Sequence, residues 1–137
     1  MTKAIVVDDY GKWRRFVAST LATYPELEIV AEAEDGPEAL LKVQELHPDL
    51  ILLDIGLPTL NGIEVASKIR NGSGKPKILF VSETSSLEIA EGALKVGDGF
   101  VIKSEAARDL VPAVKAVLEG NRFVSARLAS LQLIDRL

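Results

Sequence analysis

The sequence contains no cysteine, which excludes a disulfide framework and a zinc site built on thiolates. No apolar run approaches the ~20 residues that a membrane-spanning helix needs, so we expect no membrane partner. Acidic residues begin at Asp8, too soon for a secretory signal peptide. The formal net charge is −4 and both signs are spread along the chain, which argues against direct binding of nucleic acid. These absences together predict a cytoplasmic protein.

The length of 137 residues and the hydrophobic content of 47% suit one domain with its own core. Short apolar runs alternate with segments whose apolar residues recur at helical spacing. Such alternation predicts a parallel sheet covered on both faces by helices, in the flavodoxin-like strand order 2-1-3-4-5. The expected strands cover 4–7, 27–33, 50–54, 77–82 and 100–102, and the expected helices cover about 11–23, 39–46, 63–69, 86–96 and 106–118.

The central stretch of the chain is the segment 50–58, where four consecutive apolar residues lead into Asp54. An apolar run of this length indicates a strand buried on both faces, and Gly56 and Pro58 predict that the strand stops there. Asp54 would then stand at the carboxyl end of a central strand, the edge at which open α/β sheets bind ligands. Taken alone, Asp54 would be interpreted as a residue that caps the strand or begins a turn.

Polar residues also follow the other predicted central strands. The first strand runs into Asp8 and Asp9, the fourth ends at Ser82, and the fifth runs into Lys103. Each has an ordinary explanation by itself, as a helix cap, a strand-end serine or a surface lysine. Because the carboxyl ends of parallel strands share one edge, their joint placement favours a common site with Asp54.

Clustered carboxylates repel one another and require a cation. Asp9, Asp54 and the backbone carbonyl of Gly56 offer oxygen ligands to a hard divalent ion, and Asp8 could hold a metal-bound water. Mg²⁺ suits this short ligand set, because it keeps several waters and binds through one or two carboxylates plus a phosphate.

Two further groups extend this chemistry to phosphate. Lys103 supplies a mobile point charge and Ser82 a hydroxyl, and both can contact a phosphoryl oxygen. With Asp54 as a carboxylate nucleophile and a divalent metal, they form a phosphoryl-transfer set. A haloacid-dehalogenase-like phosphatase would need a second acid two residues after the nucleophile, where this chain has Gly56.

Over about residues 3–120 the sequence resembles the receiver domains of two-component response regulators. The resemblance rests on Val7-Asp8-Asp9, Asp54-Ile55-Gly56-Leu57-Pro58, Asn61-Gly62, Phe80-Val81-Ser82 and the segment from Gly97 to Lys103. It implies a phosphoacceptor at Asp54, metal ligands at Asp8, Asp9 and the Gly56 carbonyl, phosphoryl contacts from Ser82 and Lys103, and an aromatic switch residue at Phe100.

The resemblance also implies a signalling switch rather than a turnover enzyme. A sensor histidine kinase would donate the phosphoryl group, and the face formed by the fourth helix, fifth strand and fifth helix would then bind a second receiver, another partner or an output domain. The segment 97–125 looks most like regulators with a LuxR-type helix-turn-helix output domain. Such a domain does not fit in residues 121–137, which we interpret as a linker or a short helix with an apolar stripe at Val124, Leu128, Leu131 and Ile134. The alternatives are a stand-alone receiver whose tail packs on itself or a second copy, and a phosphorylation-independent interaction module, which the complete set of site residues disfavours.

Four positions depart from the commonest receiver pattern, at Thr59, Glu83, Asp98 and Ser104. The last replaces a frequent proline, which leaves open whether the Lys103–Ser104 peptide is cis, since a non-proline cis bond costs ~3–4 kcal/mol. Glu83 brings a negative charge near the phosphate and bears on the lifetime of the phosphoryl group.

Three other signals are rejected. The segment 72–75 lacks the upstream glycine of a phosphate-binding loop, and Pro76 follows its lysine. His47, the single histidine, is interpreted as a helix-end residue rather than a phosphoryl carrier. Trp13 and Phe16 stand at helical spacing and are expected to pack in the core.

Overall fold

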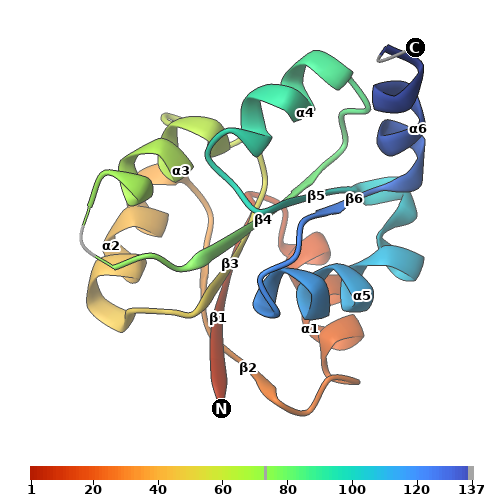
Figure 1. The fold of residues 1–137 in the computed structure, drawn as a ribbon. Helices are drawn as coiled ribbons and strands as arrows, with labels where there is room; N and C mark the ends of the chain where they lie inside the picture. Colours follow the sequence, from red (N-terminus) through yellow and green to blue (C-terminus); the bar gives the residue numbers. More distant parts are fainter. Residues whose placement is uncertain (73, 136–137) are drawn as a thin grey trace.

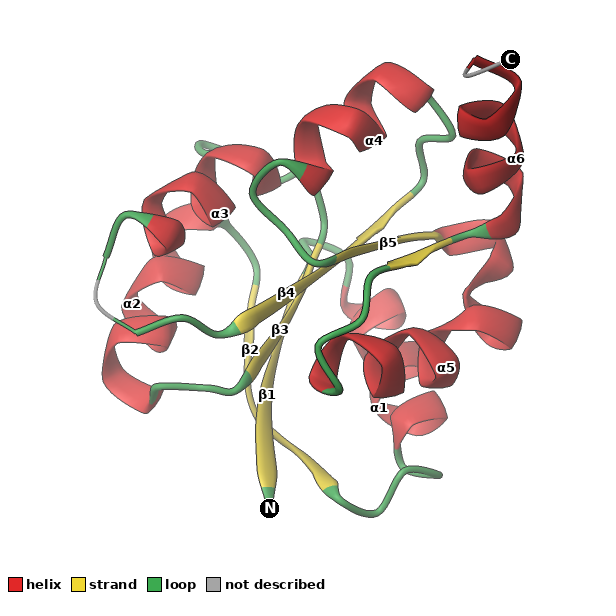
Figure 2. Ribbon diagram, in the orientation of Figure 1, coloured by secondary structure: helices red, strands yellow, loops and turns green. Residues whose placement is uncertain are grey.

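A parallel six-stranded sheet in the order β2-β1-β3-β4-β5-β6 forms the centre of the computed structural model, which describes residues 1–72 and 74–135, with side chains up to residue 130 (Figure 1). The strands are β1 (Thr2–Val7), β2 (Leu27–Ala33), β3 (Leu50–Leu53), β4 (Lys77–Ser82), β5 (Gly99–Ile102) and β6 (Phe123–Val124). The helices are α1 (Gly11–Leu21), α2 (Gly36–Leu46), α3 (Gly62–Arg70), α4 (Leu87–Leu94), α5 (Ala106–Leu118) and α6 (Ala126–Asp135), and the turn η1 (Lys103–Glu105) is a 3-10 helix (Figure 2). The predicted flavodoxin-like order is confirmed, and β6 extends it at the β5 edge.

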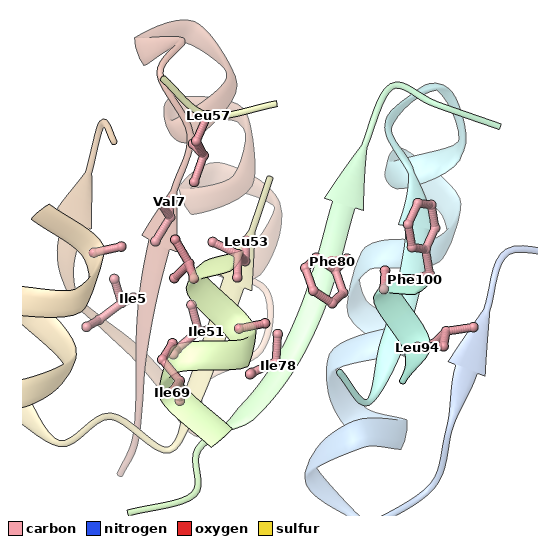
Figure 3. Packing of buried hydrophobic residues seen from close by; sticks show 14 of the residues in the cluster. Ile5, Val7, Ile51, Leu53, Leu57, Ile69, Ile78, Phe80, Leu94 and Phe100 are labelled. Atoms are coloured by element: carbon pink, nitrogen blue, oxygen red, sulfur yellow. The ribbon is translucent and has the colours of Figure 1, made fainter. Parts of the chain in front are cut away.

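Alternate residues of the central strands feed two separate cores, one on each face of the sheet. One core gathers residues such as Ile51 and Phe80 under α2, α3 and α4 (Figure 3). The other gathers Leu52 and Val81 under α1 and α5. All four residues of β3 are buried, because helices cover the strand on both sides. Each fully buried aliphatic side chain of this kind contributes roughly 1.5–3 kcal/mol relative to an exposed one.

Local sequence signals set the starts of the helices that flank the strand ends. The Asp35 side chain accepts a hydrogen bond from the Glu38 backbone N–H at 2.8 Å and caps α2, as its position before Pro37 predicts. Asn61 and Glu64 form a reciprocal capping box at α3. Gly62 is required at the start of α3, because a Cβ there would lie 2.1 Å from the backbone oxygen of Asp54.

The segment after α5 is packed against the domain, and it includes a strand that the sequence pattern did not predict. Phe123 and Val124 pair with Gly99 and Phe100 of β5. Buried Ser125 accepts a hydrogen bond from the Ile102 backbone N–H at 3.0 Å and donates one to the Asp109 carboxylate at 3.0 Å. Leu128 of the expected apolar stripe is fully buried, Val124 packs against the same core, and the side chains of Leu131 and Ile134 lie outside the described residues. At least residues 121–130 therefore form part of the folded unit.

For three of the four unusual positions, the structure shows the side-chain partners or the backbone conformation. The Asp98 carboxylate accepts hydrogen bonds from the Arg70 guanidinium at 2.6 Å and from the Ile78 backbone N–H at 2.8 Å, so it ties α3 to the start of β4. Thr59 has a positive φ of 69°, which explains why a glycine suits this position. The described residues contain no cis peptide, so the Lys103–Ser104 bond is trans.

None of the described helices is both long and apolar enough to span a membrane.

Candidate functional site

The four strand ends singled out in the sequence meet at one edge of the sheet. Asp8 and Asp9 follow β1, Asp54 follows β3, Ser82 ends β4, and Lys103 follows β5. All five line a single cavity of about 250 Å³, together with Tyr10, Gly56 and Glu83. Parallel pairing brings the strands to this edge in register, so residues far apart in the chain become neighbours.

The carboxylates of Asp8, Asp9 and Asp54 lie close enough to share an ion. One oxygen from each lies within 4.8 Å of the others. Asp8 is 1% exposed, and its Oδ1 accepts a hydrogen bond from the Tyr10 backbone N–H at 2.8 Å. Asp9 is exposed to solvent, whereas Asp54 is buried. Two acids of the cluster, Asp8 and Asp54, are therefore desolvated, and the third, Asp9, is in contact with solvent.

The pKa of Asp54 differs from that of an ordinary aspartate. Burial raises the pKa of Asp54 from 3.8 to about 6, and the negative charge of Asp8 adds to the rise. The Lys103 ammonium and the backbone amides of Gly56 and Ile55 oppose it. Desolvation outweighs these attractions, so the ionised carboxylate gains from any further positive charge brought into the cavity.

Among the described residues that line the cavity, Lys103 is the one with a positive charge. Its Nζ donates a hydrogen bond to Asp8 Oδ2 at 2.6 Å and lies 3.7 Å from Asp54 Oδ2. Only 13% of its side chain is exposed. One ammonium faces three carboxylates, so the cluster retains an excess of negative charge that a divalent cation would neutralise.

Ser82 and Phe100 lie on the neighbouring strands β4 and β5. Ser82 is buried, and within the described residues its hydroxyl accepts one long hydrogen bond of 3.4 Å, from the Thr84 backbone N–H. Phe100 is fully buried with its ring centroid 6.4 Å from that of Phe80 (Figure 3). Its backbone oxygen accepts a hydrogen bond from the Ser125 N–H at 3.0 Å, which links β5 to the C-terminal segment.

Sequence reasoning missed two residues that build the site. The Arg14 guanidinium donates to the backbone oxygen of Asp8 at 2.6 Å and forms ion pairs with Glu32 and Glu34. Tyr10 lines the cavity, and its position directly after the two acids could have indicated this.

Of the two aromatic residues expected to pack in the core, Trp13 packs against its edge and Phe16 does not. Their rings stack with centroids 4.9 Å apart, but Phe16 is 36% exposed and Trp13 is only partly buried. Val17 and Leu21 are the buried residues of α1, because that side of the helix faces the sheet. Trp13 also lies beside the site, where the Lys103 ammonium is 5.0 Å from its ring centroid.

Known proteins are similar to this chain in sequence. The profile of the response regulator receiver domain matches residues 4–115. The transcriptional regulatory protein DegU of Brevibacillus brevis is 33% identical over 125 residues, which are 90% of this chain and 53% of DegU. The response regulator protein VraR of Staphylococcus aureus is 35% identical over 86% of this chain and 57% of VraR. The chain thus spans little more than half the length of these relatives.

Solved structures agree with the fold. A two-component response regulator of the LuxR family from Aurantimonas sp. SI85-9A1 superposes with a TM-score of 0.94 and 31% identity, covering 99% of both chains. The receiver domain of RcsB from Salmonella enterica serovar Typhimurium, solved with the phosphomimetic BeF3−, superposes with a TM-score of 0.89 over 95% of this chain and 97% of that chain. Its identity of 21% supports the shared fold alone.

Proposed function

Because this chain belongs to the response regulator receiver domain family, we propose that Asp54 accepts a phosphoryl group from a phosphohistidine of a sensor histidine kinase. The observation that carries the proposal is the position of the Asp54 carboxylate, buried in an acidic cavity with the Lys103 ammonium 3.7 Å away. A carboxylate oxygen of Asp54 forms a bond to phosphorus while the phosphorus–nitrogen bond to the kinase histidine breaks. The electron pair of that bond stays on the imidazole, and an acyl phosphate remains on the chain.

The donor set fits Mg²⁺, with Asp9, Asp54 and the Gly56 carbonyl as ligands and Asp8 holding a metal-bound water. The fit rests on the three carboxylates whose oxygens lie within 4.8 Å of one another and on their excess negative charge. When bound, Mg²⁺ supplies positive charge to the phosphoryl oxygens. Within the chain, the Lys103 ammonium stabilises the negative charge of the phosphoryl oxygens. Asp8 holds that ammonium by a 2.6 Å hydrogen bond. The proposed chemistry is a single transfer and its hydrolysis, so the chain is a switch and no turnover enzyme.

The new phosphoryl group would draw Ser82 and Lys103 inward, since its oxygens accept strong hydrogen bonds. Both residues adjoin β5, whose Phe100 we propose as the aromatic switch residue. The face formed by α4, β5 and α5 would then change its affinity for a second receiver or another partner. We propose that residues 1–120 form the receiver and that 121–137, of which residues 121–130 pack on the same folded unit, lead toward an output domain. The names of the relatives, a transcriptional regulator and a LuxR-family regulator, support a role of the longer protein in transcription.

Intact-mass spectrometry after incubation with Mg²⁺ and acetyl phosphate tests the proposal, with Asp54→Asn as the matched variant. We expect one added phosphoryl group on the wild-type chain and none on the variant or without Mg²⁺. Binding of BeF3−, followed by fluorine NMR, tests the site when the small donor reacts slowly. A folded wild-type protein that gains no adduct and binds no BeF3− would contradict the proposal and favour a phosphorylation-independent interaction module.

A further inference from the structure

A second cavity adjoins the acidic one and is walled by aromatic residues. It has a volume of about 370 Å³ and is lined by Tyr10, Trp13, Glu83, Lys103 and Ser104. Three of these residues, Tyr10, Glu83 and Lys103, also line the acidic cavity, so the two cavities lie side by side. Trp13 lines only the second of these two cavities.

The Trp13 ring is held in place from two directions. It lies in the first turn of α1, and its ring stacks on that of Phe16 with an interplanar angle of 30°. Trp13 also packs against the core that α1 and α5 share. A ring supported in this way presents a fixed surface to its neighbours.

The Lys103 ammonium contacts this surface. Its Nζ lies 5.0 Å from the centroid of the Trp13 ring, inside the ~6 Å over which a cation is attracted to an aromatic face. The same atom is bonded to Asp8 at 2.6 Å and lies 3.7 Å from Asp54. Trp13 is therefore the one uncharged partner among the three groups, and it leaves the negative charge of the site unchanged.

We infer that Trp13 is a positioning residue for phosphoryl transfer, which acts by holding the Lys103 ammonium at the phosphoryl site. A lysine side chain is a flexible four-carbon stem with a strongly hydrated head, and it needs restraint to serve as a fixed charge. The indole supplies that restraint through its aromatic face. The inference rests on the proposed function, because Lys103 matters here only if it meets a phosphoryl group.

Two substitutions of Trp13 test this role by distinguishing the effect of an aromatic face from the effect of apolar volume alone. We compare Trp13→Phe, which keeps a face, with Trp13→Leu, which keeps an apolar side chain without one. Tyr24→Leu removes a partly buried aromatic residue just past the far end of α1 and controls for general loss of packing. Thermal unfolding of each variant shows which of them remain folded.

The measured quantity is the affinity for BeF3− in the presence of Mg²⁺, followed by fluorine NMR. A cation–π contact of ordinary strength predicts about two- to fivefold weaker binding by Trp13→Leu, near wild-type binding by Trp13→Phe, and no change for Tyr24→Leu. Equal binding by the Leu and Phe variants, at either the wild-type or a weakened level, would overturn the inference. Wild-type protein that binds no BeF3− would contradict the proposed function itself, so the two failures are distinguishable.

Carbon and proton NMR of the Lys103 side chain provides a second measurement that needs no ligand. The indole ring current should shift the Lys103 Cε–H resonances upfield in the wild-type protein, and the shift should vanish in Trp13→Leu. Resonances that are the same in both proteins would show that the ammonium does not lie over the ring, which overturns the inference even if the affinities differ.

Discussion

Replacement of Asp54 by asparagine should stabilise the metal-free protein at neutral pH. Burial raises the pKa of folded Asp54 to about 6, whereas the carboxyl of the unfolded chain keeps its ordinary value of 3.8. The ionised carboxylate is therefore less stable in the folded state than in water. Asparagine has nearly the same shape and cannot ionise, so it removes this cost.

The size of the effect follows from the two pKa values. One pKa unit corresponds to about 1.4 kcal/mol, so the difference between 3.8 and about 6 gives an upper value of about 3 kcal/mol. The stability of the wild-type protein is unaffected by this group below pH 3.8, where both states hold the proton. As the pH rises to about 6 the unfolded chain loses its proton first, and above that value the full cost is present.

Urea unfolding of wild-type and Asp54→Asn proteins at pH 4 and pH 7.5, without divalent metal, measures this difference. We expect the variant to gain up to about 3 kcal/mol at pH 7.5 and little at pH 4. Glu91→Gln, which neutralises an exposed carboxylate on α4, should leave stability within about 0.5 kcal/mol at both pH values. Mg²⁺ should narrow the gap at pH 7.5, because a ligand of the folded state stabilises the wild type. An Asp54→Asn protein that is no more stable than wild type at pH 7.5, or equally stabilised at pH 4, would refute this account of the site.

The remaining predictions concern the C-terminal segment and one loop. Ser125→Ala should lower the free energy of unfolding by about 1–3 kcal/mol in urea titrations, because it leaves the buried Ile102 N–H without its acceptor. The Asp109 carboxylate also loses the Ser125 hydroxyl and keeps only its hydrogen bonds from Arg108. Ser19→Ala, at an exposed position of α1, is its control and should have little effect, and equal stabilities of the two variants would contradict the docked arrangement. Thr59→Gly should raise the same free energy by about 0.5–1 kcal/mol, since glycine adopts the positive φ of 69° at no steric cost. A loss of stability in Thr59→Gly would show that the threonine side chain contributes more than the strained backbone costs.

The alternation of strands and helices could be predicted from the sequence because it depends on local periodicity. The run from Leu50 to Leu53 identifies a strand buried on both faces, and the matching observation is that all four residues are buried. The convergence of Asp8, Asp54 and Lys103 was also predictable, since the carboxyl ends of parallel strands must share an edge. Lys103 and Asp8 are 95 residues apart in the chain, yet one topological rule places them together.

Other features had no local signal. The strand β6 has two residues, too few for any periodicity, and it forms because the edge of β5 offers unpaired backbone groups to the segment that follows α5. No local pattern explains Asp98, because its hydrogen-bond partner Arg70 lies 28 residues away in the chain.

The sequence by itself determined which residues at the strand ends meet at the site, because the strands and the points where they end follow from patterns along the chain. Only the tertiary structure decided their properties. The pKa of Asp54 depends on how much water the surrounding chain excludes, and the setting of Lys103 depends on a ring presented by α1. Desolvation and side-chain contact are properties of packing in three dimensions, and no spacing of residues in a sequence measures them.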